Sequence, residues 1–524
     1  RYASRGLGDV YKRQNVGGCI FRKVILPDEI WATARTFRIC ADWYLYINIA
    51  GAGQIVFEPN AITYFRQHAT NTSSTNFHNL YYYKENMRVL QELADTWNIP
   101  IETREKFLGK VEAQWKHYGM AESHGNFDTC LNTEKYLCEG KQKPHIQIYF
   151  YGFNPGGGEL FPINLANALL DAGYIVSMVA MDLSKVNEDM RQRVNLRIPV
   201  YHAIHLAERG RAAFLDACGV SVLHSHVVSC DTFLMDLSPS KIERPFVVTL
   251  HGSYVGLQEA PRQIVDRLLE NVSTWVYTAD RNLEFFEERG IDHSEFVKLP
   301  NAMPPDPRQA AFTRAELGIP EDGVVFAFVA RGVMRKGWRA LVEAHRLLRS
   351  WGETNTYLLM VGDGEATEEA RERADGLDGV FFLGYQSEIN GIFKLSDVAV
   401  LPTRFEGESF PLILIQALQE HLPIIATDIG EISSIITSDC NITAGRLLKN
   451  DRNTDVFTEN LAQAMLEMTA AEARKSATIA AAMCAERFSM EKLIENYGNI
   501  YSAATNDRAE HIALAREAFI SQFG

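Results

Sequence analysis

The stretch Leu401–Ile432 reads LPTRFEGESFPLILIQALQEHLPIIATDIGEI and decides the fold. The apolar run that ends at Pro402 predicts a strand, and Pro423–Thr427 predicts the next one. Between them lies an acidic loop, followed by a helix that opens at Phe410 or Pro411, where proline suits the first turn. The order strand, loop, helix, strand predicts part of a parallel α/β sheet.

The same alternation of strand-like and helical segments begins at about Lys143, and the proline-rich break Pro304–Arg308 (PPDPR) divides it into two series. The pattern predicts an α/β fold with two Rossmann-like lobes. Ligands bind at the carboxyl ends of strands in open parallel sheets, so we expect the site in the cleft between the lobes. The expected strands are His145–Phe153, Tyr174–Asp182, Pro245–Leu250, Trp275–Thr278, Val324–Arg331, Thr356–Val361, Gly379–Leu383, Asp397–Pro402 and Pro423–Thr427.

Composition limits the classes of protein that remain. A chain of 524 residues exceeds a single core, and its net charge of −14 argues against a nucleic-acid partner. It has no apolar run of about 18 residues, so we expect no membrane span. The eight cysteines are scattered without a C-x-x-C pair, which predicts reduced thiols in a cytoplasmic protein.

Two cations mark the start of the second series. Arg331 ends an expected strand, and Lys336 and Gly337 follow where a helix begins. Together with the helix N-terminus they can clamp a diphosphate. A pair of solvated surface cations is the alternative.

The next two features of the second series also have two interpretations. Gly362 and Gly364 flank an aspartate in a turn that lets the backbone approach a ligand closely, or that simply joins a strand to a helix. Glu408, just before the helix, is either a ligand-binding carboxylate or an N-cap.

In this order the three features resemble the retaining family 4 glycosyltransferases, which have the GT-B fold. In that family a strand leads into E-G-F-G-x-x-x-x-E, then a helix, a strand and a glycine turn, as the stretch from Leu401 does here. The resemblance implies that Arg331 and Lys336 hold the donor diphosphate and that Glu408 contacts the donor sugar. The Gly384-Tyr385 turn would lie against the nucleotide base.

The resemblance implies a set of site residues. The catalytic set is Arg331, Lys336, Glu408 and His251. The donor-binding set is Gly156, Gly157, Gly158, Gly362, Gly364, Tyr385, Ser409, Phe410, Pro411, Leu412 and Gln416, with the backbone amides around Ser409–Leu412 facing phosphate or sugar oxygens. The unit would need no metal cofactor, because the nucleotide-sugar is a substrate and protein cations hold its diphosphate.

Gln416 departs from the family motif, which has a second glutamate eight residues after the first. A carboxylate there would accept two hydrogen bonds from the ribose diol, whereas an amide has one acceptor oxygen and no charge. We expect donor binding weaker by roughly 1–1.5 kcal/mol, about tenfold in affinity. The chemistry itself would be unchanged, although a changed nucleotide preference or inactivity becomes more plausible.

The first series resembles the acceptor lobe of the same family. Its loop Gly156–Gly158 would face the donor phosphates, or is a flexible turn, and His251 would bond the donor sugar, or is structural. His224 and His226 resemble an H-x-H strand end and are interpreted as structural. From Lys143 to Lys298 there are 14 lysines and arginines against 19 aspartates and glutamates, which favours a soluble or loosely membrane-bound acceptor.

Residues 1–14 are interpreted as a cloning artefact, with a natural basic arm as the alternative. Residues 15–125 resemble the closing half of a family 2, GT-A glycosyltransferase, which implies an α/β remnant with Asp42 as base and His68 near a divalent metal site that only a complete unit would hold. An accessory α/β cap is the alternative. We expect a linker at 126–142, lobes at 143–304 and 305–490, and C-terminal helices at 491–524 that pack partly on the first lobe.

We therefore expect a glycosyltransferase (hexosyltransferase type) that moves a sugar with retention from a nucleotide-sugar to a saccharide or lipid-linked saccharide, in bacterial surface polysaccharide biosynthesis. It would be cytoplasmic, with peripheral contact at the inner face of the plasma membrane as an option. The alternatives are a GT-B epimerase and a non-catalytic sugar-nucleotide-binding scaffold.

Overall fold

The computed structural model describes residues 26–52, 77–97, 99, 101–137, 143–237, 241–242, 244–252, 254 and 262–505. Several expectations lie outside these residues: the artefact at 1–14, His68, and the end of the chain beyond 505. Among the described residues, no helix is long and apolar enough to cross a membrane.

The described residues of the N-terminal unit form helices joined by turns. Its helices are α2 (Asp28–Ala34), α3 (Ala41–Ala52), α5 (Leu80–Trp97), α6 (Ile101–His117), α7 (Met120–His124), α8 (Phe127–Leu131) and α9 (Glu134–Leu137). The α/β character expected for a GT-A remnant is not found in the described residues of this unit, which contain no strand.

The prediction of a linker at 126–142 is wrong for the first part of this range. Residues 127–137 form α8 and α9, and both short helices pack on the unit's core. Phe127 and Leu131, four residues apart, bury one face of α8. The Asn126 side chain caps this helix by accepting a hydrogen bond from Thr129 N at 3.0 Å.

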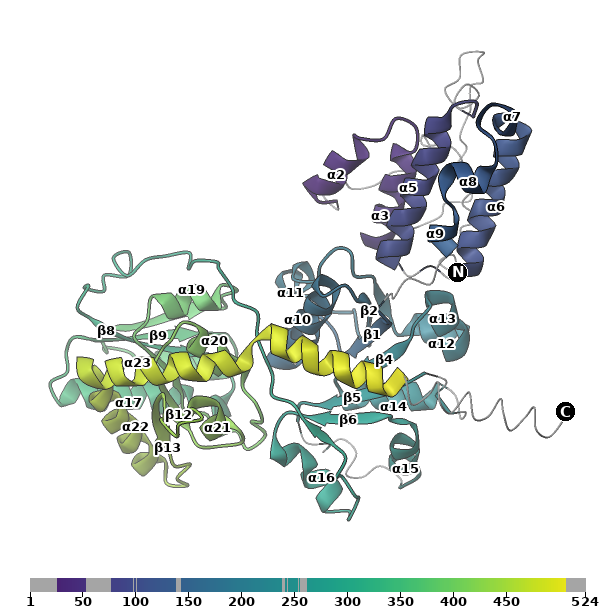
Figure 1. Ribbon diagram of the computed structural model, residues 1–524. Helices are drawn as coiled ribbons and strands as arrows, with labels where there is room; N and C mark the ends of the chain where they lie inside the picture. Colours follow the sequence, from purple (N-terminus) through teal and green to yellow (C-terminus); the bar gives the residue numbers. More distant parts are fainter. Residues whose placement is uncertain are drawn as a thin grey trace.

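The first lobe is a seven-stranded parallel sheet in the order β3-β2-β1-β4-β5-β6-β7, with helices on both faces (Figure 1). Its strands are β1 (His145–Phe150), β2 (Ile175–Ala180), β3 (Val200–His202), β4 (Val222–Ser225), β5 (Phe246–Leu250), β6 (Thr274–Tyr277) and β7 (Val297–Lys298). Its helices are α10 (Gly157–Asp171), α11 (Glu188–Gln192), α12 (Ile204–Arg209), α13 (Arg211–Cys218), α14 (Val228–Asp236), α15 (Arg262–Asn271), η4 (Asp280–Leu283) and α16 (Glu284–Glu287).

The second lobe is a six-stranded parallel sheet in the order β10-β9-β8-β11-β12-β13. Its strands are β8 (Val324–Val329), β9 (Thr356–Val361), β10 (Val380–Gly384), β11 (Val398–Leu401), β12 (Ile424–Thr427) and β13 (Gly445–Leu448). Its helices are η5 (Met334–Lys336), α17 (Trp338–Ser350), α18 (Glu365–Arg373), α19 (Ile389–Lys394), α20 (Leu412–Gln419), α21 (Ile432–Ile436), α22 (Thr454–Thr469), α23 (Ala471–Ala485) and η6 (Glu486–Phe488).

The strand order reverses at one point in each sheet, between β1 and β4 in the first lobe and between β8 and β11 in the second. Strands such as β8 (VVFAFV) are continuous apolar runs because helices cover both faces of the sheet. The loops that follow these four strands meet at the two switch points, where open α/β sheets bind ligands.

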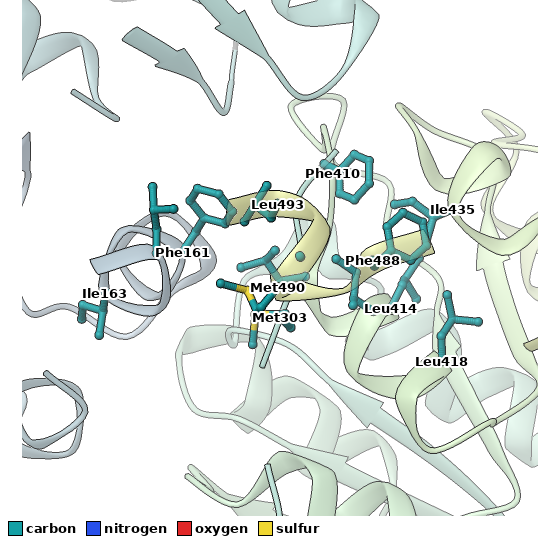
Figure 2. Close-up of a cluster of buried hydrophobic side chains, with 14 of the residues drawn as sticks. Phe161, Ile163, Met303, Phe410, Leu414, Leu418, Ile435, Phe488, Met490 and Leu493 are labelled. Atoms are coloured by element: carbon teal, nitrogen blue, oxygen red, sulfur yellow. The ribbon is translucent and has the colours of Figure 1, made fainter. Parts of the chain in front are cut away.

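The chain crosses between the lobes twice. After the Pro304–Arg308 break it enters the second lobe, and at residues 490–505 a helix returns to the first lobe (Figure 1). One continuous hydrophobic cluster therefore includes residues of both lobes. Figure 2 shows its centre, where Phe161 and Ile163 of α10 lie near Met303, Leu414 and Met490.

Candidate functional site

A short ion pair lies at the switch point of the second lobe. Lys336 Nζ, at the end of η5, contacts the Glu408 carboxylate, and both side chains are largely buried, with 14% and 11% of their surface exposed. The Thr403 hydroxyl donates to Glu408 Oε2 at 3.2 Å, and Lys336 Nζ lies 5.3 Å from the Phe405 ring centroid. The structure therefore brings together these two residues, whose roles at a donor site stay a prediction.

Glu408 is not the N-cap of the following helix. The helix α20 begins at Leu412 with Pro411 as its N-cap, and no side chain accepts from its first turn. The expected opening at Phe410 or Pro411 is one to two residues early. The Phe410 side chain packs in the interlobe core, 5.8 Å from Phe488 between ring centroids (Figure 2), so only its backbone is available to a ligand.

The loop that carries Arg331 and Lys336 is held by a close backbone contact with the turn after β9. Gly332 N donates to Asp363 O at 2.7 Å. A Cβ on Gly332 would lie 2.4 Å from Gly364 N, and Gly364 has φ +142. The two glycines therefore pack back to back, and this turn supports the cation loop from behind.

The Gly384-Tyr385 turn, which was expected to lie against the nucleotide base, is hydrogen-bonded to the turn after β9. Asp363 Oδ2 accepts from Tyr385 N at 2.8 Å, and Gly362 N donates to Gly384 O at 2.8 Å. The Tyr385 side chain is 39% exposed, so its ring is accessible to a ligand.

The N-termini of two helices from opposite lobes face each other. The helix α10 begins at Gly157, and a Cβ on Gly157 would lie 3.5 Å from the Leu412 side chain at the start of α20. Both helices present unpaired N–H groups and a partial positive charge at this point. Burial raises the pKa of Glu159, in the first turn of α10, and the nearby Arg331 charge partly offsets that shift.

Polar contacts that were not predicted from the sequence connect the lobes beside this junction. Arg281 donates to the Glu408 carbonyl at 3.2 Å, and Asn282 donates to Ser409 Oγ at 3.0 Å. Glu431 accepts from Asp280 N and from Lys298 Nζ, each at 3.0 Å. No motif marks these positions in the sequence, because each acts through a partner that is distant along the chain.

Histidines follow two neighbouring strands of the first lobe, β4 and β5. His251 follows β5, is partly exposed and packs 4.8 Å from Phe161 between ring centroids. His226 follows β4, and its Nδ1 lies 3.0 Å from His251 Nε2. Burial lowers the pKa of His251 to about 4, so its ring is neutral at physiological pH.

Gln416 lies one turn into α20 and is buried. Its Nε2 donates to Asn390 Oδ1 at 3.2 Å. Gln416 also lines a pocket of about 240 Å³ between the lobes, together with Asn164, Arg193, Met303, Pro304, Pro305, Asp306 and Arg308. Arg193 and Arg308 both donate to Ser387 O at 2.9 Å, and neither was predicted.

In the N-terminal unit, Asp42 lies in the first turn of α3, where its carboxylate accepts from Trp43 N at 2.9 Å. Burial raises the Asp42 pKa above its usual value. His68, its expected companion, lies outside the described residues. The predicted role of Asp42 as a catalytic base therefore stays a prediction.

Residues 323–469 match a family model described as Glycosyl transferases group 1. The phosphatidyl-myo-inositol mannosyltransferase of Mycolicibacterium smegmatis is 25% identical over 324 residues, 57% of this chain and 79% of that protein. The lipopolysaccharide core biosynthesis glycosyltransferase LpsD of Rhizobium meliloti is 34% identical over 96 residues, 18% of this chain and 26% of that protein. Among the curated relatives that it matches, the chain spans between 26% and 79% of their own lengths.

The fold is similar to that of solved glycosyltransferases. The crystal structure of Anabaena HepE in complex with UDP and glucose matches with a TM-score of 0.52 at 15% identity, covering 71% of this chain and 99% of that chain. This likeness shows the GT-B fold. The matched domain and the curated relatives identify the two-lobed unit as a glycosyltransferase.

Proposed function

We propose that the two-lobed unit transfers a sugar from a nucleoside diphosphate donor to a saccharide acceptor with retention of the anomeric configuration. The contact between Lys336 and Glu408, next to the facing N-termini of α10 and α20, carries this proposal. It brings a cation, a carboxylate and two sets of unpaired N–H groups to one point of the cleft. A sugar diphosphate presents hydroxyls and anionic oxygens that match these groups.

The diphosphate would be held by cations and helix termini. Arg331 is exposed and unpaired with a carboxylate in the described residues, so its planar fork is available for two phosphate oxygens. Lys336 is already positioned by Glu408, which reduces the reorganisation needed when a donor binds. These charges stabilise the departing diphosphate, whose oxygen accepts the proton of the acceptor hydroxyl. Protein cations alone form this clamp, so no metal ion is required.

The sugar would lie between the lobes. Glu408, with one oxygen on Lys336 and Thr403, accepts from the sugar hydroxyls, and His251 approaches from the first lobe. Arg281 and Asn282 fix the backbone and side chain of residues 408 and 409 across the cleft, so they keep Glu408 in register with the first lobe. The HepE complex, which holds UDP and glucose, supports a uridine nucleotide as the first donor to test.

We propose a saccharide or lipid-linked saccharide of a bacterial surface polysaccharide as the acceptor, reached from the cytoplasmic side with loose membrane contact. The acidic balance of the first lobe gives no electrostatic attraction to anionic lipid, which fits loose rather than tight membrane contact. A second candidate function, a scaffold that binds a sugar-nucleotide without turnover, is favoured by one observation: an amide, Gln416, stands where the family has a carboxylate.

Nucleotide release from a panel of UDP-, GDP- and ADP-sugars separates the two functions. We expect release by the wild-type chain and a loss of about 100- to 1000-fold in Arg331→Ala, the effect of removing one group that stabilises transition-state charge. Arg335→Ala removes an exposed cation from the same loop and should leave release unchanged. Donor binding by calorimetry without release from any donor would contradict transfer and establish the scaffold.

A further inference from the structure

Three histidine rings lie in a row at the carboxyl ends of β4 and β5 in the first lobe. The centroids of His224 and His226 are 4.2 Å apart, and those of His226 and His251 are 5.3 Å apart with an angle of 23° between the ring planes. The nearly parallel planes suit a hydrogen bond between His226 Nδ1 and His251 Nε2, which are 3.0 Å apart. The ring of His251 is therefore held through one nitrogen by another histidine.

All three rings are neutral, which limits how this bond can form. Burial lowers the pKa of His224 to about 3, that of His251 to about 4, and that of His226 well below the usual range. A neutral imidazole carries one N–H donor and one acceptor nitrogen. One ring must therefore donate and the other accept, and each choice fixes the tautomers of both rings.

The second ring nitrogen of His226, Nε2, decides which of the two rings donates the hydrogen bond. His226 Nε2 is buried without a hydrogen-bond partner among the residues that the structure describes. If His251 donated, the proton of His226 would sit on this Nε2 as a buried N–H without an acceptor. If His226 donates from Nδ1, its Nε2 is a lone pair, and unsatisfied buried acceptors are less rare than unsatisfied buried N–H groups. The second arrangement puts the proton of His251 on Nδ1.

We propose that His226 is a positioning residue that donates a hydrogen bond from its Nδ1–H to His251 Nε2 and thereby fixes His251 as the tautomer whose Nδ1–H is available to a donor sugar. This inference rests on the proposed function for the identity of the ligand. It replaces the interpretation of His226 as merely structural. His251 then acts as a hydrogen-bond donor of fixed direction, and its companion Glu408 on the second lobe is the acceptor.

The C-terminal helix at residues 490–505 holds the ring of His224 in place. Tyr501 OH lies 2.7 Å from His224 Nδ1, and Thr249 Oγ1 lies 2.8 Å from His224 Nε2. The Tyr497 hydroxyl lies 3.0 Å from Thr249 Oγ1. Both nitrogens of His224 are therefore engaged, so its ring forms a fixed floor against which His226 stacks. The second lobe, through its C-terminal helix, contributes to the position of His251.

The tautomer of His251 tests the proposal without any assay of transfer. Nitrogen NMR on the full chain with ring-labelled histidine, assigned with His251→Asn, distinguishes a protonated Nδ1 from a protonated Nε2. We expect the Nδ1–H form in the ligand-free wild type. A protonated Nε2 on His251 would overturn the proposal even if the chain transfers sugar, and the expected tautomer would be found even if it does not.

Kinetics of two matched variants test the consequence. In His226→Asn the amide Nδ2 can occupy the position of the ring Nδ1, whereas in His226→Gln the amide lies nearer the position of Nε2. We expect kcat within about twofold of wild type for Asn, and about tenfold lower for Gln and His226→Ala, with donor KM little changed, since one neutral hydrogen bond is lost. His345→Gln, a buried histidine in α17, is the control for removing a buried ring.

The pattern of the variants distinguishes positioning from packing. Equal kcat losses for Asn and Gln, or a loss equalled by His345→Gln, would show that bulk and stability alone matter and would overturn the proposal. Melting temperatures of all variants separate a failure to fold from a failure to position. If no donor is turned over by the wild type, the proposed function fails while the tautomer measurement still decides the role of His226.

Discussion

Gln416 is accommodated by a relay of amide and carboxylate groups. Its Nε2 donates to Asn390 Oδ1, and Asn390 Nδ2 donates to Glu420 Oε1 at 2.9 Å. A glutamate at position 416 would require Asn390 to turn its amide and present Nδ2, which would place its oxygen against Glu420. The residue that departs from the family motif is therefore matched to its neighbours in this chain.

Gln416→Glu is expected to lower the donor KM about tenfold and leave kcat similar, because a carboxylate accepts two hydrogen bonds from the ribose diol. The same change should lower the free energy of unfolding by about 1–3 kcal/mol, since one buried hydrogen bond is lost and two acceptors face each other. Adding Glu420→Gln supplies a donor to Asn390 and should restore stability. Donor titrations and thermal melts check both effects, and an unchanged KM in the double variant would contradict the ribose assignment.

At the same scale, the sequence identified the residues that belong to motifs and missed those that act across the cleft. Lys336 and Glu408 were predictable because each stands at a strand-to-helix turn of recognisable pattern. Arg281 and Asn282 were not, because their partners lie 127 residues away and contribute a carbonyl and a hydroxyl that carry no sequence signal.

At the scale of elements, the loop after β8 depends on the turn after β9. Arg331 and Lys336 lie on the loop after β8. Gly332 in this loop packs against Gly364 in the turn after β9, and their backbones approach too closely for any side chain. The alternation of strands and helices was predictable from continuous apolar runs. The packing of these two turns was not, because it depends on how β8 and β9 pair.

Gly332→Ala is expected to displace the loop of Arg331 and Lys336, because its Cβ would lie 2.4 Å from Gly364 N and backbone atoms cannot move aside independently. We expect a loss of about 1–3 kcal/mol in stability, as for other overpacked sites, and a clear fall in nucleotide release. Gly109→Ala is the control: Gly109 lies exposed in α6 with open space at its Cβ, so release should not change. Wild-type release and melting in Gly332→Ala would show that the two turns separate easily.

The segment 126–142 was predicted to be a linker, and this prediction was wrong for residues 127–137. Its polar composition indicated a linker, yet Phe127, Leu131 and Tyr136 bury their side chains against the N-terminal helices. Short helices with few apolar residues give no clear periodicity, so tertiary contacts decide their structure.

At the scale of the whole molecule, the lobes share one hydrophobic cluster and a set of polar contacts, and both contain buried neutral histidines. Burial lowers the pKa of His145, His251 and His345 to about 4, that of His224 to about 3, and that of His226 well below the usual range. These rings cannot take up protons until the pH approaches 4, whereas the unfolded chain protonates them near pH 6.5. The free energy of unfolding of the two-lobed unit is therefore expected to decrease at a pH where histidine becomes protonated in the unfolded chain.

The melting temperature is accordingly expected to fall steeply as the pH drops from about 6.5 towards 5. In this window the unfolded state binds more protons than the folded state, so each of these histidines lowers the free energy of unfolding by at most about 1 kcal/mol per pH unit. Asp231 acts with the opposite sign and offsets about one histidine, because burial raises its pKa to about 7 and stability is lost as the pH rises towards that value. His345→Gln keeps an amide near Thr356 O and removes one titrating ring, so its melts between pH 5 and 7 should show a shallower slope than those of the wild type. Parallel slopes for the two proteins would contradict a buried neutral His345 as a source of acid sensitivity.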